Sequence, residues 1–434
     1  MALLLIAAVY VVLFAYYIHE TMIGQPYWDM FSIITRYLQY ERDGNLWAYL
    51  WEPHVQHRHV WMRLLTSFDA RVFSGIAYPF VVVAAACQVT TAWLLWRAAR
   101  RSEAGDAGIW MGCVAVMAVL TSVAAVDCAI PMNGIYPQAV MFVVMAVVLF
   151  NGEERTDGRG HLQMRRVLAV LGAIAAAFGN AAALCVWPIL VWLAWRVRAG
   201  RVWMSALVIV GSVFGAAYLY RLPGVALGDA SSPVAPGLGA AWRVGDYLIT
   251  YMGLPWTRSA ALAAAGKGIG ALFLLMSIAS CLWWGVVRPA KSALDRLACS
   301  LVAFSLATAL LAAFGRSGID ADLRVPVRYS VFVALMHVGL LFFAGPRILA
   351  RWNSLSQRRV VYAAAVAVAL LLTAQQIVSG QAAVATTQSM RATLARFAAG
   401  EETDDMKAVV YVDLEQARRD HNAIRAAGLY LRAR

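Results

Sequence analysis

Charged residues are scarce in this sequence. Only 14% of its 434 residues are Asp, Glu, Lys or Arg, whereas 62% are hydrophobic and the mean hydropathy is +0.65. A soluble chain of this length needs a far more polar surface, so the composition indicates an all-α protein that crosses a membrane several times. The net charge of +13 lies between the apolar segments, so we expect membrane lipids, not nucleic acid, as partners.

The sequence also lacks the patterns of several other classes. Its six cysteines lie mostly inside apolar segments and form no C-x-x-C pair, which argues against a disulfide framework and a zinc site. From the second apolar segment to the eleventh, no Asp, Glu, Lys or Arg lies well inside a segment, and His337 is the only histidine there. Ion-driven transporters usually carry carboxylates within the membrane, so this absence disfavours that class.

Eleven apolar segments predict about eleven membrane-spanning helices, within a range of 10 to 12. A hydrocarbon core of about 30 Å needs about 20 helical residues. The segments are residues 2–18, 77–96, 107–126, 137–150, 167–179, 181–195, 202–220, 268–287, 297–314, 329–344 and 360–378. The first has no basic start and no A-x-A cleavage site, so we expect a helix and not a signal peptide. The fifth and sixth are short and meet at Gly179-Asn180, where we expect a break.

The basic residues predict how the chain crosses the membrane. The loops 97–106, 151–166, 196–201, 288–296 and 345–359 hold 17 Arg and Lys in 56 residues. The loops on the other side, 19–76, 127–136, 221–267 and 315–328, hold 12 in 129 residues. Short basic loops stay in the cytoplasm. We therefore expect a multi-pass protein of the bacterial inner membrane, with a cytoplasmic amino terminus and a periplasmic carboxyl terminus.

The same orientation divides the chain into regions. We expect residues 1–380 to form the transmembrane domain, with long periplasmic loops at 19–76 and 221–267 that carry short interfacial helices. The second of these loops is rich in proline and glycine, which indicates a flexible connection. Residues 381–434 are mixed polar and predict a small periplasmic element packed over the loops.

Cysteine labelling tests this orientation. A membrane-impermeant maleimide added from outside should label the cysteines introduced into the predicted periplasmic loops and none of those introduced into the cytoplasmic loops, because the bilayer blocks the reagent. The sites are Gly44→Cys, Ser231→Cys and Gly400→Cys outside, and Gly105→Cys, Gly158→Cys and Asn353→Cys inside. Outside labelling of Gly158→Cys would reverse the orientation and move every candidate site residue to the cytoplasm.

The first outer loop concentrates polar chemistry. Asp29 lies eleven residues past the first segment, between aromatic neighbours, and the stretch WEPHVQHRHVWMRLL follows at 51–65. Pro53 can occupy the first position of a helix, which would place His54, His57 and Arg58 on one face. An apolar stripe for the membrane or the neighbouring spans would then continue along His57, Trp61, Leu64, Leu65 and Phe68. Simple anchoring at the membrane interface is the alternative, because aromatic and basic residues are common there.

Three further outer stretches carry polar side chains. Asp127 and Asn133 lie in the connection at 127–138, and Asn180 lies at the Gly-Asn break. The connection after the ninth segment contributes three arginines and a tyrosine, namely Arg316, Arg324, Arg328 and Tyr329. Arginine forks match phosphate oxygens, and these arginines lie on the side that lacks the positive-inside bias, so they favour an anionic ligand. Pairing with Asp320 and Asp322 of the same connection is the alternative.

The order of these motifs resembles the GT-C superfamily of integral-membrane glycosyltransferases, in which a long first outer loop carries an early acidic residue. More narrowly, W-x-P-H-x-x-H-R with the downstream L-L-x-x-x-D is similar to an uncharacterised bacterial GT-C-like family with a PHNEHR-type motif. Val55 and Gln56 stand where that motif has Asn and Glu, and loop 127–138 lacks the Glu that often precedes the asparagine. The similarity continues at residues 179–188, 315–329 and 409–434.

The resemblance implies transfer of a sugar from a polyprenyl-phosphate-linked donor to a glycan or lipid-linked acceptor at the periplasmic face. Such a displacement needs a carboxylate base, for which Asp29 is the candidate. The leaving phosphate needs cationic partners, for which Arg316, Arg324, Arg328 or Arg58 are candidates. The predicted substrate-binding residues also include Glu52, His54, His57, Asp127, Asn133, Asn180 and Tyr329.

Cofactor and alternative functions follow from the same residues. The predicted donor is the polyprenyl-phosphate sugar, and no cofactor is predicted besides it. A divalent metal is an open alternative without support, because His54 and His57 have no third ligand at a suitable spacing. A transporter or flippase for a lipid-linked glycan is one alternative, which arginines in an inner cavity would favour. A lipid-directed acyltransferase is another, disfavoured because His337 is the only histidine within a segment.

Overall fold

The computed structural model describes residues 1–54, 57–101, 106–152, 159–222, 238–254, 263–287, 290, 292–316, 325–351, 354–411 and 413–431. Over these residues the chain is helical, and the only β-type pairing is an isolated bridge between His54 and His57. Within the described ranges, eight helices are long and apolar enough to cross a membrane, or nine if one bent pair counts as a span. The predicted class, an all-α chain with several membrane-spanning helices, is confirmed.

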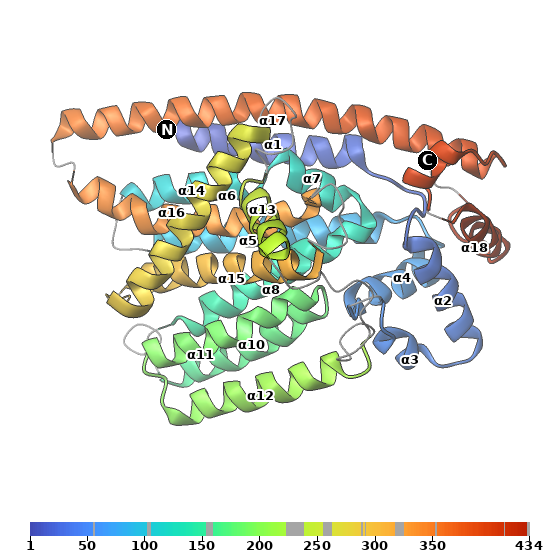
Figure 1. Cartoon of the computed structure of the whole chain (residues 1–434), viewed down its shortest axis with the longest axis horizontal. Coiled ribbons are helices and arrows are strands. Elements are labelled where there is room, and N and C mark those ends of the chain that lie inside the picture. The colour runs from blue at the N-terminus through green and yellow to red at the C-terminus, as the bar shows by residue number, and fades with distance from the viewer. Residues whose placement is uncertain are drawn as a thin grey trace.

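Most of the spanning helices run roughly along one direction, and one, at Ala263–Leu282, lies obliquely across them (Figure 1). The spanning helices are α1 (Ala2–Thr21), α5 (Tyr78–Arg100), α8 (Ile135–Phe150), α12 (Arg201–Leu219), α14 (Ala263–Leu282), α15 (Ala293–Arg316), α16 (Ser330–Arg351) and α17 (Leu355–Ala398). The bent pair consists of α6 (Asp106–Val119) and α7 (Ser122–Ala129), which meet at 48°. At the bend, the side-chain oxygen of Gln376 on α17 accepts hydrogen bonds from the main-chain N–H and the hydroxyl of Ser122, both at 2.8 Å.

Two shorter apolar helices meet where the sequence predicts a break. Helix α10 (Arg159–Ala177) ends before the 3-10 turn η2 (Ala181–Cys185), which leads into α11 (Val186–Arg196). Asn180 begins η2 by accepting the N–H of Ala182 at 2.9 Å. At Gly179, a Cβ atom would lie 2.8 Å from the carbonyl oxygen of Ile135, so glycine lets this corner pack closely against α8. The predicted break at Gly179-Asn180 is confirmed.

The helices of residues 30–73 and 404–426, which carry most of the polar loop residues, gather at one end of the bundle, called the polar end here (Figure 1), beside the carboxyl ends of α1 and α17. They are α2 (Met30–Arg42), α3 (Leu46–Trp51), α4 (Val60–Phe73), the 3-10 turn η7 (Asp404–Ala408) and α18 (Leu414–Ala426). The remaining elements are η1 (Pro131–Gly134), α13 (Leu238–Met252), η5 (Trp283–Val287) and η6 (Val327–Tyr329). The site described below lies where this polar end meets the spans.

Helix α17 joins the membrane part to the polar end. Its 44 residues correspond to about 66 Å at 1.5 Å per residue, roughly twice the hydrocarbon thickness. Along α1, the hydroxyl of Tyr17 donates to the carbonyl of Ile377 at 3.1 Å, and Gly380 leaves room for the Tyr17 ring. The helix continues across residue 380, so the predicted boundary between the transmembrane domain and the carboxyl-terminal element falls within one helix.

The carboxyl-terminal element is fastened to the first outer loop. The carboxylate of Asp69, on α4, accepts the hydroxyl of Tyr430 at 3.0 Å and the N–H groups of Ile76 and Ala77 at 3.2 and 3.0 Å. The main-chain N–H of Tyr430 donates to the carbonyl of Ser74 at 3.0 Å. Asp69 is fully buried, so this aspartate of the L-L-x-x-x-D motif holds two distant parts of the chain together.

A glycine substitution tests this attachment. Gly75 has a φ of +74°, and a Cβ there would lie 2.6 Å from the Tyr430 ring, whereas Gly44 has a φ of +68° with open space around it. We expect Gly44→Ala to lower the free energy of unfolding by about 1 kcal/mol through backbone strain alone. Gly75→Ala should destabilise more and expose the chain near residue 400 to protease, because the ring must move. Equal effects in thermal unfolding would contradict a tight contact with Tyr430.

Candidate functional site

His54 and His57 do not have the main-chain bonding of the predicted helix. The N–H of His54 donates to the carbonyl of His57 at 2.8 Å, and the N–H of His57 donates to the carbonyl of His54 at 3.0 Å. These mutual bonds are incompatible with a helix that starts at Pro53, and α4 begins only at Val60. The prediction of one helical face with His54, His57 and Arg58 is therefore wrong.

Arg58 is bonded to the protein itself. Its side chain is buried, and its Nε donates to the carbonyl of Tyr218 at 2.8 Å. Its two terminal nitrogens donate to the carbonyls of Trp51 and Tyr220, and its main-chain N–H donates to the Tyr218 hydroxyl at 3.0 Å. All three guanidinium nitrogens thus have carbonyl partners. Arg58 ties the end of α12 to the first outer loop, and we do not include it in the site.

Glu52 also has internal partners. Its carboxylate lies 3.5 Å from a terminal nitrogen of Arg63 and 3.8 Å from the Nε of Arg36. Arg63 is buried and donates further to the carbonyl of Tyr49. Because removing one partner of a buried ion pair leaves the other charge unpaired, Glu52 and Arg63 mainly hold α3 against α4.

Asp29 lies at the start of α2, and its carboxylate does not cap that helix. One oxygen, Oδ2, lies 3.4 Å from Nε2 of His54, and 35% of the Asp29 side chain is exposed against 17% for His54. The preceding residue, Trp28, has a φ of +50° and donates its N–H to the carbonyl of Val410 at 2.8 Å. The carboxyl-terminal element therefore reaches the residue next to Asp29.

The imidazole rings of His54, His57 and His59 lie together, with His54 next to Asp29. The His54 and His59 rings are 5.5 Å apart, and the His57 and His59 rings stack at 5.2 Å with an angle of 28°. Burial lowers the pKa of His59 well below its ordinary value, and the neighbouring His57 and His54 lower it further. His59 is therefore neutral at physiological pH.

His57 connects this group to the arginines. Its pKa is lowered to about 4, first by burial and then by the charge of Arg316, by His54 and by the charge of Arg328. The N–H of Ala181 donates to Nδ1 of His57 at 3.4 Å. A neutral imidazole that accepts at Nδ1 carries its hydrogen on Nε2. His57 therefore offers one N–H donor close to two guanidinium groups.

The two arginines flank an aromatic pair. Arg316 lies 6.0 Å from the centre of the Tyr329 ring, and Arg328 lies 5.9 Å from Tyr329 and 6.0 Å from Tyr136. The two tyrosine rings meet edge to face at 5.9 Å. The Nε of Arg328 is buried and has no hydrogen-bond partner among the described residues. A buried donor without a partner is unfavourable, which suits a site completed by an acceptor such as a phosphate oxygen.

Tyr27 shows that the acidic and basic groups belong to one neighbourhood. Burial raises the pKa of this phenol, the charge of Arg328 lowers it, and the carboxylates of Asp127 and Asp29 raise it further. Asp127 accepts from the side-chain amide of Asn133 at 3.1 Å. The three groups around Tyr27 come from residues 29, 127 and 328, so the fold brings together distant parts of the chain.

The predicted residues thus separate into two sets. Asp29, His54, His57, Asp127, Asn133, Arg316, Arg328 and Tyr329 form one neighbourhood, whereas Arg58 and Glu52 are bonded internally and Asn180 caps η2. Arg324 lies outside the described residues. Sequence reasoning missed Tyr27 and His59 as members of the site. Their positions beside Asp29 and within the histidine stretch were the available signal.

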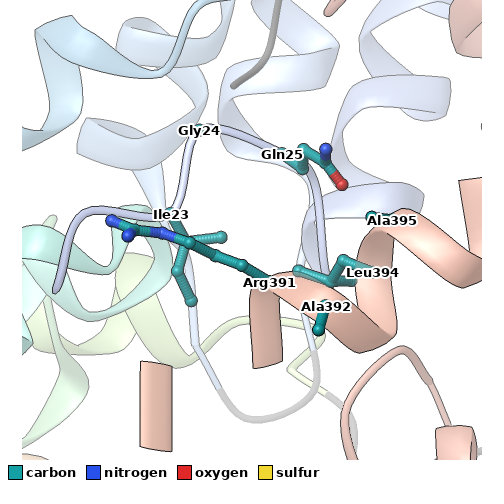
Figure 2. Close-up of a pocket in the computed structure, with 7 residues that line it drawn as sticks. All are labelled: Ile23, Gly24, Gln25, Arg391, Ala392, Leu394 and Ala395. Atoms are coloured by element: carbon teal, nitrogen blue, oxygen red, sulfur yellow. The ribbon is translucent and has the colours of Figure 1, made fainter. Parts of the chain in front are cut away.

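A separate pocket lies beside the linker between α1 and α2. It has a volume of about 270 Å³ and is lined by Ile23, Gly24, Gln25, Arg391, Ala392, Leu394 and Ala395 (Figure 2). Arg391 donates from Nε to the carbonyl of Met22 at 3.1 Å, which fastens α17 to this linker. None of the predicted site residues lines the pocket.

Comparison of the chain with protein-family models, with curated proteins and with solved structures finds no match. Among the described residues, no group of three or more His, Cys, Asp or Glu side chains is placed to hold a metal ion. The neighbourhood combines the partly exposed carboxylate of Asp29, the neutral imidazoles of His57 and His59, and two guanidinium groups. These are groups suited to proton removal beside an anionic leaving group.

Proposed function

We propose that this chain is a GT-C-type glycosyltransferase of the bacterial inner membrane. It transfers a sugar from a polyprenyl-phosphate-linked donor to a glycan or lipid-linked acceptor at the periplasmic face, with its amino terminus in the cytoplasm. The proposal counts eleven spans. Beyond the helices that meet the length and hydropathy criteria, these include the bent pair of α6 and α7, helix α10, and the segment Ala181–Arg196.

One observation supports this function most. His57 lies in one group with His54, whose Nε2 is 3.4 Å from Asp29, and it also lies within electrostatic reach of Arg316 and Arg328. A base for the acceptor and cations for the leaving phosphate are therefore neighbours. Direct transfer from a phosphate-linked sugar needs both at once.

Asp29, Arg316 and Arg328 suffice for the proposed transfer. The acceptor hydroxyl gives its proton to Asp29 while its oxygen attacks the anomeric carbon. The bond from that carbon to the phosphate oxygen breaks, and the electron pair leaves with the polyprenyl phosphate. Arg316 and Arg328 stabilise the charge that develops on this oxygen, because preorganised donors stabilise charge without reorganisation.

The exposed apolar face of α4, beside the site, suits a lipid-linked donor. Helix α4 exposes Leu64, Phe68 and Val72 to 39%, 49% and 58%. Residues four apart lie on one face of a helix, so these side chains form an apolar stripe. An interfacial helix with such a face can contact lipid tails while its start, next to His59, lies at the polar site.

The function is tested with the purified protein in liposomes. Polyprenyl-phosphate sugars with different sugars would be supplied with lipid-linked glycans extracted from bacterial membranes. We expect release of polyprenyl phosphate that depends on the extract, together with a heavier glycan product. Movement of intact donor to the opposite leaflet would instead support a flippase. No consumption of any donor by folded protein would overturn the proposal.

A further inference from the structure

The contact between His54 and Asp29 indicates a role for His54 other than substrate binding. His54 is buried except for 17% of its side chain, and its Nε2 makes no hydrogen bond among the described residues. That nitrogen lies 3.4 Å from Oδ2 of Asp29. The two exchanged main-chain bonds with His57 hold the backbone of His54 in place. The main chain of His54 is therefore held in place, with one imidazole nitrogen close to the carboxylate.

A hydrogen atom between these two atoms would make their contact favourable. An unprotonated imidazole nitrogen that faced an ionised carboxylate would bring two lone pairs together. An Nε2–H donor removes this repulsion, and the neutral imidazole can carry its hydrogen on Nε2. The greater exposure of Asp29, at 35%, leaves the carboxylate and not the imidazole open to an incoming hydroxyl.

We propose that His54 is a positioning residue, which donates from Nε2 to Oδ2 of Asp29 and so directs the other carboxylate oxygen at the acceptor hydroxyl. This inference rests on the proposed function and gives His54 a role through Asp29 instead of through the substrate. No covalent step is added, because the proton of the acceptor still goes to Asp29.

The surroundings of the pair support a fixed donor. The His54 side chain faces Asp29, at the start of α2, and His59, in its own segment. The charges of Arg316 and Arg328 act on the neighbouring His57. Around Asp29, the phenols of Tyr27 and Tyr411 have raised pKa values, mainly because of burial and in part because of the Asp29 carboxylate.

Two substitutions separate donation from titration. His54→Gln keeps an N–H donor but cannot titrate, so we expect its kcat to stay within about threefold of the parent. His54→Leu removes the donor and should lower kcat roughly 10- to 100-fold, the range typical of partners that orient a reacting group, with an unchanged KM for the donor.

A double mutant makes the test decisive. If His54 acts through Asp29, His54→Leu in an Asp29→Asn background should cost nothing further, because residues that act as a unit are not additive. His19→Leu, at an exposed histidine in the last turn of α1, is the control and should leave kcat unchanged. Parent-like kcat in His54→Leu, or a further loss in the double mutant, would overturn the inference. Full activity of Asp29→Asn would also overturn the inference, because His54 would then have no base to orient, whereas the proposed function fails only if folded parent protein consumes no donor.

Discussion

Asp29→Asn should abolish sugar transfer while the protein still folds and binds its donor. Asparagine keeps the size of the side chain but cannot accept the acceptor proton. General bases contribute about 10²- to 10⁴-fold to turnover, and we expect a loss of kcat in that range. Because Asp29 does not cap α2 through its side chain, its replacement should leave the helix and the thermal stability almost unchanged.

The control for this variant lies at the other end of the same helix. Asp43 follows the last residue of α2 and is exposed, so Asp43→Asn changes an equivalent charge away from the site. Steady-state turnover and binding of a radiolabelled donor would be measured for both variants. Near-parent turnover in Asp29→Asn would exclude Asp29 as the base and leave Asp127 as the carboxylate of the same neighbourhood.

Arg328→Lys should lower kcat/KM for the donor by roughly 10- to 100-fold. Lysine keeps the positive charge but loses the planar fork that can hold two phosphate oxygens. One hydrogen bond to a charged group contributes about 1.5–3 kcal/mol, which corresponds to a loss of about that size. The burial of the Arg328 Nε without a hydrogen-bond partner is the feature that makes this arginine the most sensitive one. Arg316→Lys, at the other side of Tyr329, should show a smaller loss of the same kind.

The matched control is Arg71→Lys. Arg71 is 52% exposed and pairs with Glu41 at 3.1 Å, so the substitution changes an exposed arginine of the first outer loop without affecting the site. Arg63→Lys would be a poor control, because Arg63 is buried against Glu52 and Tyr49. If Arg328→Lys and Arg316→Lys both turn over donor like the parent, these arginines do not hold the phosphate. Arg58 cannot replace them, since its nitrogens already donate to main-chain carbonyls.

The helical class and the positions of the apolar helices could be read directly from the sequence. Each predicted apolar segment overlaps a helix of the structure, because runs of apolar residues between basic loops leave a membrane chain few alternatives. The break at Gly179-Asn180 was equally local, since a glycine that allows close packing is followed by an asparagine that caps the next turn. The presence of Asp29 early in the first outer loop also needed no tertiary information.

The arrangement of the site was decided only by tertiary contacts. The spacing of His54, His57 and Arg58 suits a helix as well as a turn, and local sequence does not choose between them. The main-chain carbonyls of Tyr218 and Tyr220, about 160 residues further along the chain, accept hydrogen bonds from the Arg58 guanidinium, and so does the carbonyl of Trp51. These tertiary contacts decide the conformation. In the same way, Asp29 meets His54, and His57 meets Arg316 and Arg328, only after the spans have packed. Hydrogen bonds and charges that act between distant segments leave no periodic signal in the sequence, which is why the helices were predictable and their polar contacts were not.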